Sequence, residues 1–169
     1  MYFPELTHQK AYSFPVKYRK WLLSFLFLWS VVSSIHAQEA DEIIKWEFSS
    51  NKKNSSTQDI VDLVFTGTLQ KGWILYSSDF TADIGPQPTV FTFTDSANIS
   101  LIGTIIPQTA LRKKDKTWGT ELRYFTDKAI FRAKVLLRKT GSPVKGIITG
   151  QLCSNKEGIC IPFQKIFEL

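Results

Sequence analysis

The sequence predicts an all-β fold, an antiparallel β-sandwich. Short apolar runs, several with strict alternation of apolar and polar residues, recur between residues 43 and 167, and a period of two indicates a half-buried strand. Turn-forming Gly, Pro, Asn, Asp and Ser residues separate these runs, and almost no stretch has the period of a helix. About eight or nine strands at this spacing are typical of an immunoglobulin-like sandwich.

The first half of this domain alternates strands with polar turns. In the first strand, Ile44, Trp46 and Phe48 face one way, and the polar residues 49–56 (SSNKKNSS) then indicate a loop. A later loop, residues 79–88, ends in Gly-Pro-Gln-Pro and should be rigid and extended because proline fixes φ. The strands expected in this half are residues 43–48, 59–69, 73–77 and 89–94.

The second half ends in a β-hairpin. Residues 99–106 form an apolar run broken by Gly103, and residues 111–119 are charged and irregular with one large aromatic, Trp118. The remaining expected strands are residues 121–125, 129–137, 144–152 and 161–167. The last two of these make the hairpin, which closes the domain.

The N-terminus has the pattern of a signal peptide. Residues 17–20 are a basic stretch, residues 21–32 are apolar, and residues 33–37 offer a cleavage site after Ala37. Twelve apolar residues are few for a membrane span. We therefore expect residues 1–37 to be an N-terminal extension with a signal peptide, and residues 38–169 to be one mature domain, periplasmic or secreted. The alternative is an uncleaved N-terminal membrane anchor.

The charge balance gives little support for nucleic-acid binding. Removing residues 1–37 removes four of the 21 basic residues and one of the 15 acidic ones, which leaves a net charge of +3. Basic and aromatic residues do not interleave on a recognisable platform. The high isoelectric point of the whole chain therefore comes in part from the leader.

The chain has two cysteines, Cys153 and Cys160, at the mouth of the expected final hairpin. Facing residues on antiparallel strands lie about 4.5–5.5 Å apart between Cα atoms, and disulfides need about 4.4–6.8 Å. In an oxidising compartment the two can pair. Their spacing alone leaves two interpretations open, a structural staple of the hairpin and a working redox pair.

Other chemistries find little support in the expected mature chain. Both histidines, His8 and His36, precede residue 38, so Ser-His and Cys-His nucleophile systems are excluded there. Two cysteines without a nearby histidine are too few for a zinc site. No Gly-rich phosphate loop is present. We expect no metal and no small-molecule cofactor.

Four stretches resemble the N-terminal periplasmic domain of the thiol:disulfide interchange protein DsbD and its stand-alone relatives. They are residues 72–77 (GWILYS), residues 85–89 (GPQPT), residues 115–119 (DKTWG) and the closing hairpin, residues 144–163. The spacing between Cys153 and Cys160 is one or two residues longer than the family pattern, and the loop at residues 113–119 is more basic.

The resemblance implies an immunoglobulin-like fold and an exchanging pair, Cys153 and Cys160. Within this pair we take Cys153 as the attacking residue. It implies a cap or second shell made by Tyr76, Asp115 and Trp118, with Trp118 as a lid over the disulfide. A membrane thiol-transport protein would reduce the pair, and the pair would reduce thioredoxin-like periplasmic proteins. The chain ends at Leu169, so we expect the donor to be a separate protein.

We therefore predict an exported thiol–disulfide exchange module, a protein-disulfide reductase component that acts through transient mixed disulfides. The alternative is a β-sandwich that binds a protein or a glycan without catalysis. In that alternative the disulfide is structural, and Trp73, Tyr76 and Trp118 form an exposed aromatic surface.

Overall fold

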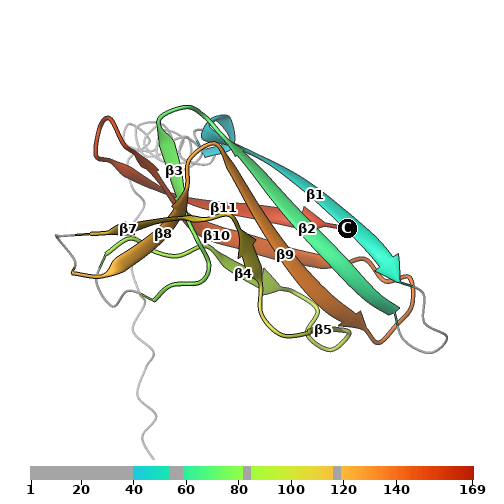
Figure 1. The fold of residues 1–169 in the computed structure, drawn as a ribbon. Coiled ribbons are helices and arrows are strands. Elements are labelled where there is room, and N and C mark those ends of the chain that lie inside the picture. The colour runs from blue at the N-terminus through green and yellow to red at the C-terminus, as the bar shows by residue number, and fades with distance from the viewer. Residues whose placement is uncertain (1–39, 54–58, 82–84, 116–118) are drawn as a thin grey trace, which may run out of the picture. The chain divides into compact units, whose positions relative to one another are not determined.

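The structure is a computed structural model, and it describes residues 40–53, 59–81, 85–115 and 119–169, with only the backbone of residues 52 and 53. Two antiparallel sheets pack face to face in this part of the chain (Figure 1). The predicted immunoglobulin-like antiparallel β-sandwich is confirmed. The described residues include no helix that is long and apolar enough to cross a membrane.

Sheet A carries the two longest N-terminal strands. Its order is β1-β2-β9-β5, and β6 pairs with another part of β9. Its strands are β1 (Ile44–Lys53), β2 (Asp59–Leu69), β5 (Ile99–Leu101), β6 (Ile106–Gln108) and β9 (Lys128–Leu137).

Sheet B carries the two cysteines. Its order is β11-β10-β3-β8-β7, and β4 pairs with the far end of β10. Its strands are β3 (Trp73–Tyr76), β4 (Val90–Phe93), β7 (Leu111–Lys114), β8 (Glu121–Phe125), β10 (Lys145–Ser154) and β11 (Cys160–Glu168). Strand β11 therefore lies at one edge of the sheet.

The core lies between the two sheets and is rich in aromatic rings. Alternate residues of β2 and β9 are buried, as the alternating sequence predicts. Phe65 from β2 packs edge-on against Phe167 from β11, with ring centroids 4.9 Å apart. Phe131 from β9 packs in the same way against Phe125 from β8, at 5.2 Å. Such pairs join the two sheets and stabilise them beyond simple burial, by about 0.5–1.5 kcal/mol each.

Two segments differ from the sequence prediction. Residues 49–53, expected in a loop, continue β1, because each residue of β1 faces a partner on β2 as far as Lys53 opposite Ile60. Residues 111–114, expected to be irregular, form β7 at the edge of sheet B, with every residue exposed. Charged side chains are common on edge strands, where they discourage pairing with another chain. The described residues form eleven strands, more than the eight or nine expected.

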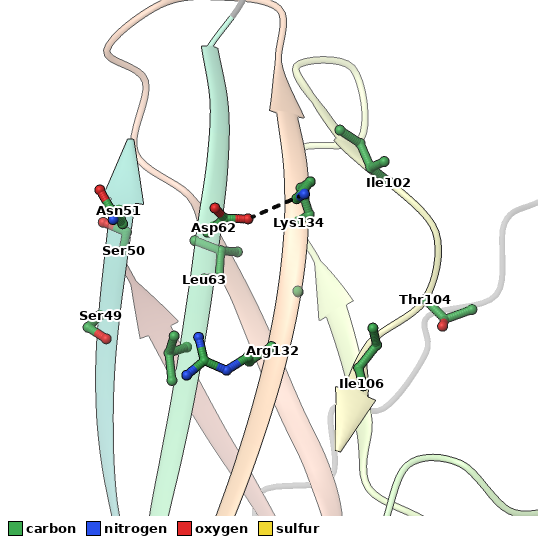
Figure 2. Close-up of a pocket in the computed structure, with 12 residues that line it drawn as sticks. Ser49, Ser50, Asn51, Asp62, Leu63, Ile102, Thr104, Ile106, Arg132 and Lys134 are labelled. Carbon is green, nitrogen blue, oxygen red and sulfur yellow. Dashed lines mark ion pairs between the residues drawn. The ribbon is translucent and has the colours of Figure 1, made fainter. Parts of the chain in front are cut away.

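The outer face of sheet A is not flat. Residues 102–105 leave the sheet between β5 and β6, and a groove of about 570 Å³ lies between this arch and β1, over β2 and β9 (Figure 2).

Candidate functional site

The two cysteines face each other next to the turn of the β10–β11 hairpin, as predicted. Cys153 is the register partner of Cys160, their Cα atoms are 4.1 Å apart and their sulfur atoms are bonded. The amide of Ser154 donates to the carbonyl of Ile159 at 2.8 Å. Ser154 and Ile159 are thus a hydrogen-bonded pair, and the cysteines beside them are a non-hydrogen-bonded pair, the kind in which side chains of antiparallel strands lie closest. The register itself brings the sulfur atoms together.

The turn between the cysteines is held by its own backbone and by one serine. The amide of Gly158 donates to the carbonyl of Ser154 at 3.0 Å, and the amide of Glu157 donates to Ser154 Oγ at 3.1 Å. Gly158 has a φ of +68°, which glycine adopts without the strain that a side chain would add. The amide of Asn155 donates to the carbonyl of Gly72, which ties the turn to the start of β3.

The two sulfur-bearing residues differ in access. Cys153 is buried, with 5% of its surface exposed, whereas Cys160 is exposed. The cause is their place in sheet B. Cys153 lies on β10, where Ile74 of β3 is its register partner on the other side, whereas Cys160 begins the edge strand β11. A reacting thiolate must reach one sulfur atom of the bond, and Cys160 is the exposed residue of the pair.

Tyr76 lies on the strand next to the disulfide. It is two residues from Ile74 on β3, so both point to the same face of sheet B. Its register partner is Tyr124 on β8, and its ring lies 6.0 Å from that of Phe80. Burial raises the pKa of the Tyr76 phenol above its ordinary 10.0, and the carboxylate of Asp115 and the neighbouring Tyr124 raise it further. The phenol is therefore a neutral hydrogen-bonding group at neutral pH.

Asp115 lies at the end of β7, near Tyr76. Its amide donates to the carbonyl of Thr120 at 2.9 Å, and its carbonyl accepts from the amide of Gly119 at 3.0 Å. Lys113 Nζ lies 4.0 Å from its carboxylate, whose side chain is 17% exposed. Its carboxylate is one of the charges that raise the pKa of Tyr76. Trp118, the expected lid, lies outside the described residues.

The aromatic surface of the binding-module alternative is not found in the described chain. Trp73 packs against the core, Tyr76 is half-buried, and none of the large exposed hydrophobic side chains described is aromatic. The described residues also include no group of three or more His, Cys, Asp or Glu side chains able to hold a metal ion.

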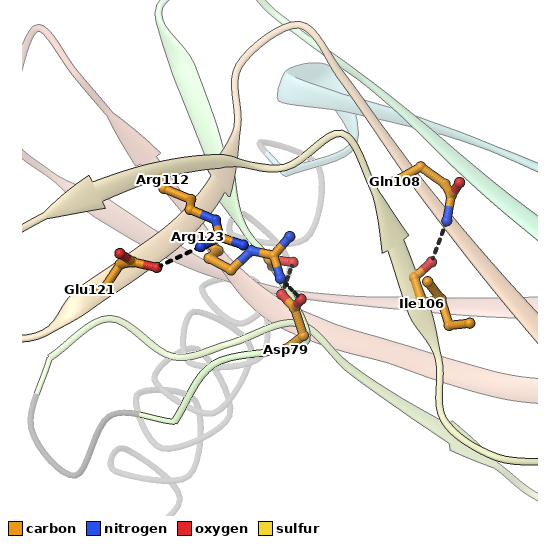
Figure 3. A network of polar contacts seen from close by, with 7 residues as sticks. Asp79, Ile106, Gln108, Arg112, Glu121 and Arg123 are labelled. Carbon is orange, nitrogen blue, oxygen red and sulfur yellow. Dashed lines mark hydrogen bonds and ion pairs between the residues drawn. The ribbon is translucent and has the colours of Figure 1, made fainter.

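An ion pair that sequence analysis missed holds the loop after β3 against sheet B. Arg123 on β8 forms an ion pair with Asp79, and Ser77 Oγ donates to the same carboxylate at 2.7 Å (Figure 3). Arg123 also faces Arg112 in the β7–β8 register. Each arginine has its own acid, because Arg112 lies 3.5 Å from Glu121. Nothing in the spacing of these residues along the chain could have shown this pairing.

The other end of the same loop lies beside the disulfide hairpin. Thr89 Oγ1 donates to the carbonyl of Tyr76 at 2.5 Å, and the amide of Gln87 donates to Gln151 Oε1 at 3.0 Å. Gln151 lies two residues before Cys153 and points to the same face. The only sequence signal for this contact was the Gly-Pro-Gln-Pro stretch. It predicted a stiff, extended segment but did not show that this segment lies beside Gln151.

The family is settled by the extent of one match. The family described as "Thiol:disulfide interchange protein DsbD, N-terminal" matches residues 41–169, which include every strand described above. The chain belongs to this family. The resemblance drawn from its four stretches is therefore confirmed, and the family carries out thiol–disulfide exchange. No curated protein sequence matches the chain.

One solved structure of a related domain shares the fold, and two others are similar at lower TM-scores. The N-terminal periplasmic domain of ScsB from Proteus mirabilis is 18% identical, with a TM-score of 0.54, over 77% of this chain and 47% of that one. The chain thus spans about half the length of the ScsB structure. The reduced DsbD N-terminal domain of Neisseria meningitidis is 18% identical (TM-score 0.45; 72% and 83% covered). The complex of the DsbD and PilB N-terminal domains from the same organism contains a chain 16% identical (TM-score 0.44; 72% and 80% covered).

Proposed function

We propose that this DsbD N-terminal domain passes reducing equivalents by thiol–disulfide exchange through Cys153 and Cys160. The observation that carries the proposal is the asymmetry of the bridge, with Cys160 exposed at a sheet edge and Cys153 buried beside β3. A staple needs no accessible sulfur, whereas an exchanging pair needs one to be reached and the other to be shielded.

In the reducing half-reaction, a thiolate of a donor dithiol attacks Cys160 Sγ. The bond between the two cysteines breaks, a mixed disulfide joins the donor to Cys160, and the Cys153 sulfur leaves with the electron pair and takes up a proton. The second donor thiol, as its thiolate, then attacks the donor sulfur of the mixed disulfide. The donor leaves oxidised and the domain is left with two thiols.

In the transfer half-reaction, the thiolate of Cys160 attacks the disulfide of an acceptor protein and releases one acceptor sulfur. Cys153 then attacks Cys160 Sγ in the mixed disulfide, which restores the bridge and frees the reduced acceptor. The sequence alone favoured Cys153 as the attacking residue. Its burial supports the opposite assignment, with Cys160 attacking and Cys153 resolving.

The setting of this reaction is also part of the proposal. Residues 1–37 would direct export and be removed near Ala37, which leaves residues 38–169 in the periplasm. The donor would be a membrane thiol-transport protein and the acceptors thioredoxin-like proteins, with the domain acting as a protein-disulfide reductase component. The related DsbD domain of Neisseria meningitidis forms a complex with the PilB N-terminal domain, which supports a protein as the partner.

The residues around the bridge would control access to it. Tyr76, a neutral phenol on the strand beside Cys153, and Asp115, which acts on that phenol, would form the second shell. Trp118 would cover the bridge when no partner is bound. The loop that is held by the Asp79–Arg123 ion pair and by the Gln87–Gln151 hydrogen bond would limit access to the bridge from its own side.

Trapping single-cysteine variants tests the proposal. Cys153→Ala leaves Cys160 free, and it should form mixed disulfides with a disulfide-bonded thioredoxin-like protein, seen as a band that disappears under reduction. Cys160→Ala leaves the buried Cys153 and should trap far less. Equal trapping by both variants would contradict the assigned roles. No trapping by either would favour a structural bridge.

A further inference from the structure

The groove on the outer face of sheet A belongs to no part of the site described above. It lies on the sheet that does not carry the disulfide. Strand register brings four outward side chains into one row across it, because Ser49 faces Val64, Val64 faces Arg132, and Arg132 faces Ile106. A second row runs beside the first, with Asn51 opposite Asp62 and Asp62 opposite Lys134.

The wall of the groove is the arch between β5 and β6. The amide of Ile102 donates to the carbonyl of Lys134 at 2.7 Å, and Gly103 then turns with a φ of +74°. The chain returns to β9 only at Ile106. Residues 103–105 therefore stand beside β9 without strand pairing. The resulting hollow of about 570 Å³ is within the usual range for ligand sites, about 300–1,000 Å³.

The charge inside the groove is unbalanced. Lys134 Nζ lies 3.8 Å from Asp62 Oδ1, so these two side chains neutralise each other. The guanidinium of Arg132 makes no hydrogen bond or ion pair with any residue that the structure describes. Figure 2 shows its side chain extending from β9 across β2, next to the Asp62–Lys134 pair. A free guanidinium presents a planar fork that binds a carboxylate through two parallel hydrogen bonds.

Apolar side chains lie on the other side of β9 from this guanidinium, which points over β2 (Figure 2). Ile102 is 41% exposed and Ile106 is 56% exposed, both on the arch side. Neighbouring exposed isoleucines leave apolar surface in contact with water, and covering it with another apolar group is favourable by about 25 cal/mol per Å². Ser49, Asn51 and Thr104 complete the lining with hydrogen-bonding groups.

We propose that this groove binds a short extended peptide segment of a partner protein in which an acidic residue is followed, two positions later, by an apolar residue. In an extended peptide these two side chains point the same way. The carboxylate would meet Arg132 over Val64, and the apolar side chain would cover Ile102 and Ile106. The groove contains neither cysteine, so binding is the same in the oxidised and the reduced domain.

Chemical-shift mapping with a defined peptide tests this. The probe is acetyl-Glu-Ser-Leu-amide, titrated into the ¹⁵N-labelled oxidised protein at low salt. We expect saturable shifts at the amides of residues 62–64 and 132–134, with a dissociation constant of the order of 1 mM. Replacing Glu by Gln in the peptide should weaken binding about tenfold, the scale of a charge-assisted hydrogen bond. Replacing Leu by Ser should also weaken it.

Protein variants separate the two contacts. Arg132→Gln should weaken the probe about tenfold and abolish its preference for Glu over Gln. Arg132→Lys, which keeps the charge and loses the fork, should lie between Arg132→Gln and the wild type. Ile106→Ser should reduce the preference for Leu over Ser. The matched control is Arg112→Gln, an equal loss of charge at a side chain 67% exposed on sheet B, and it should change nothing.

Several results would overturn the proposal. They are an absence of saturable shifts, shifts confined to sheet B, equal affinity for the Glu and Gln peptides, or equal weakening by Arg112→Gln. Repeating the titration on a Cys153→Ala/Cys160→Ala variant keeps this test independent of the redox proposal. The peptide should bind this variant with unchanged affinity whether or not the domain exchanges thiols.

Discussion

Reduction of the Cys153–Cys160 bond should cost the domain a modest, measurable part of its stability. The cysteines are seven positions apart, so the bond closes a loop of about eight residues in the unfolded chain. The chain-entropy relation then gives roughly 2.5 kcal/mol of stabilisation at 25 °C. The hydrogen bonds of the turn and the pairing with β3 do not depend on the bond, so the reduced domain should stay folded.

Urea unfolding of the oxidised and the reduced protein measures this difference directly. We expect the same m-value for both and a free energy of unfolding lower by about 2–3 kcal/mol in the reduced form. A Cys153→Ala/Cys160→Ala variant is the control, because it lacks the bond under all conditions. It should unfold like the reduced protein, apart from the small packing loss at the buried Cys153.

A thermodynamic cycle checks the same number by another route. If the folded state favours the bond by about 2.5 kcal/mol, the reduction potential of the native protein should lie about 50 mV below that of the protein in strong urea, since about 1.4 kcal/mol corresponds to about 30 mV. Equal stability of the two forms would refute the loop argument. A difference above about 5 kcal/mol would show that the bond is a structural requirement.

Three further predictions concern the residues around the site. Asp79→Asn should lower the free energy of unfolding by about 1–2 kcal/mol in urea, because it leaves Arg123, whose Nε is buried without a partner in the described chain, facing Arg112; an unchanged midpoint would contradict this. Gly146→Ala should lower the free energy of unfolding by about 3 kcal/mol, because the added Cβ would lie 2.5 Å from the backbone oxygen of Thr92 and 2.7 Å from a Phe167 ring carbon. Gly141→Ala, which adds a Cβ in open space at a φ of +78°, should lower it by about 1–2 kcal/mol. In an ultraviolet titration one tyrosine should ionise with a pKa above the ordinary 10.0, and this titration step should be missing in Tyr76→Phe. Because the folded state keeps this proton longer, the contribution of Tyr76 to stability is complete below about pH 10 and falls as the pH rises through the raised pKa. A normal titration would contradict the burial of the phenol.

Local pattern was enough to predict much of the fold. Asp59–Leu69 and Glu121–Phe125 were predicted with the bounds that the structure gives, because alternation and flanking turns mark both. The facing of Cys153 and Cys160 followed from a short hairpin with turn residues between its strands. The hairpin was also the part of the site that depends least on distant contacts.

Pairing between distant strands decided what the sequence did not show. Residues 49–53 are polar enough for a loop, yet their backbone pairs with β2, which places Ser49 opposite Val64. The unequal burial of the cysteines depends on β3 lying beside β10, more than seventy residues away in the chain. The Asp79–Arg123 pair and the groove row at Arg132 likewise exist only once the sheets are ordered.

In the proposed function, the bridge between Cys153 and Cys160 is a redox centre. Its reduction potential, measured by equilibrating the native protein with glutathione or dithiothreitol buffers of known poise, tests this most directly. We predict a potential above about −300 mV, where thioredoxin-like proteins and their reductants can exchange with it. A potential below about −300 mV, the range of structural disulfides, would contradict the account.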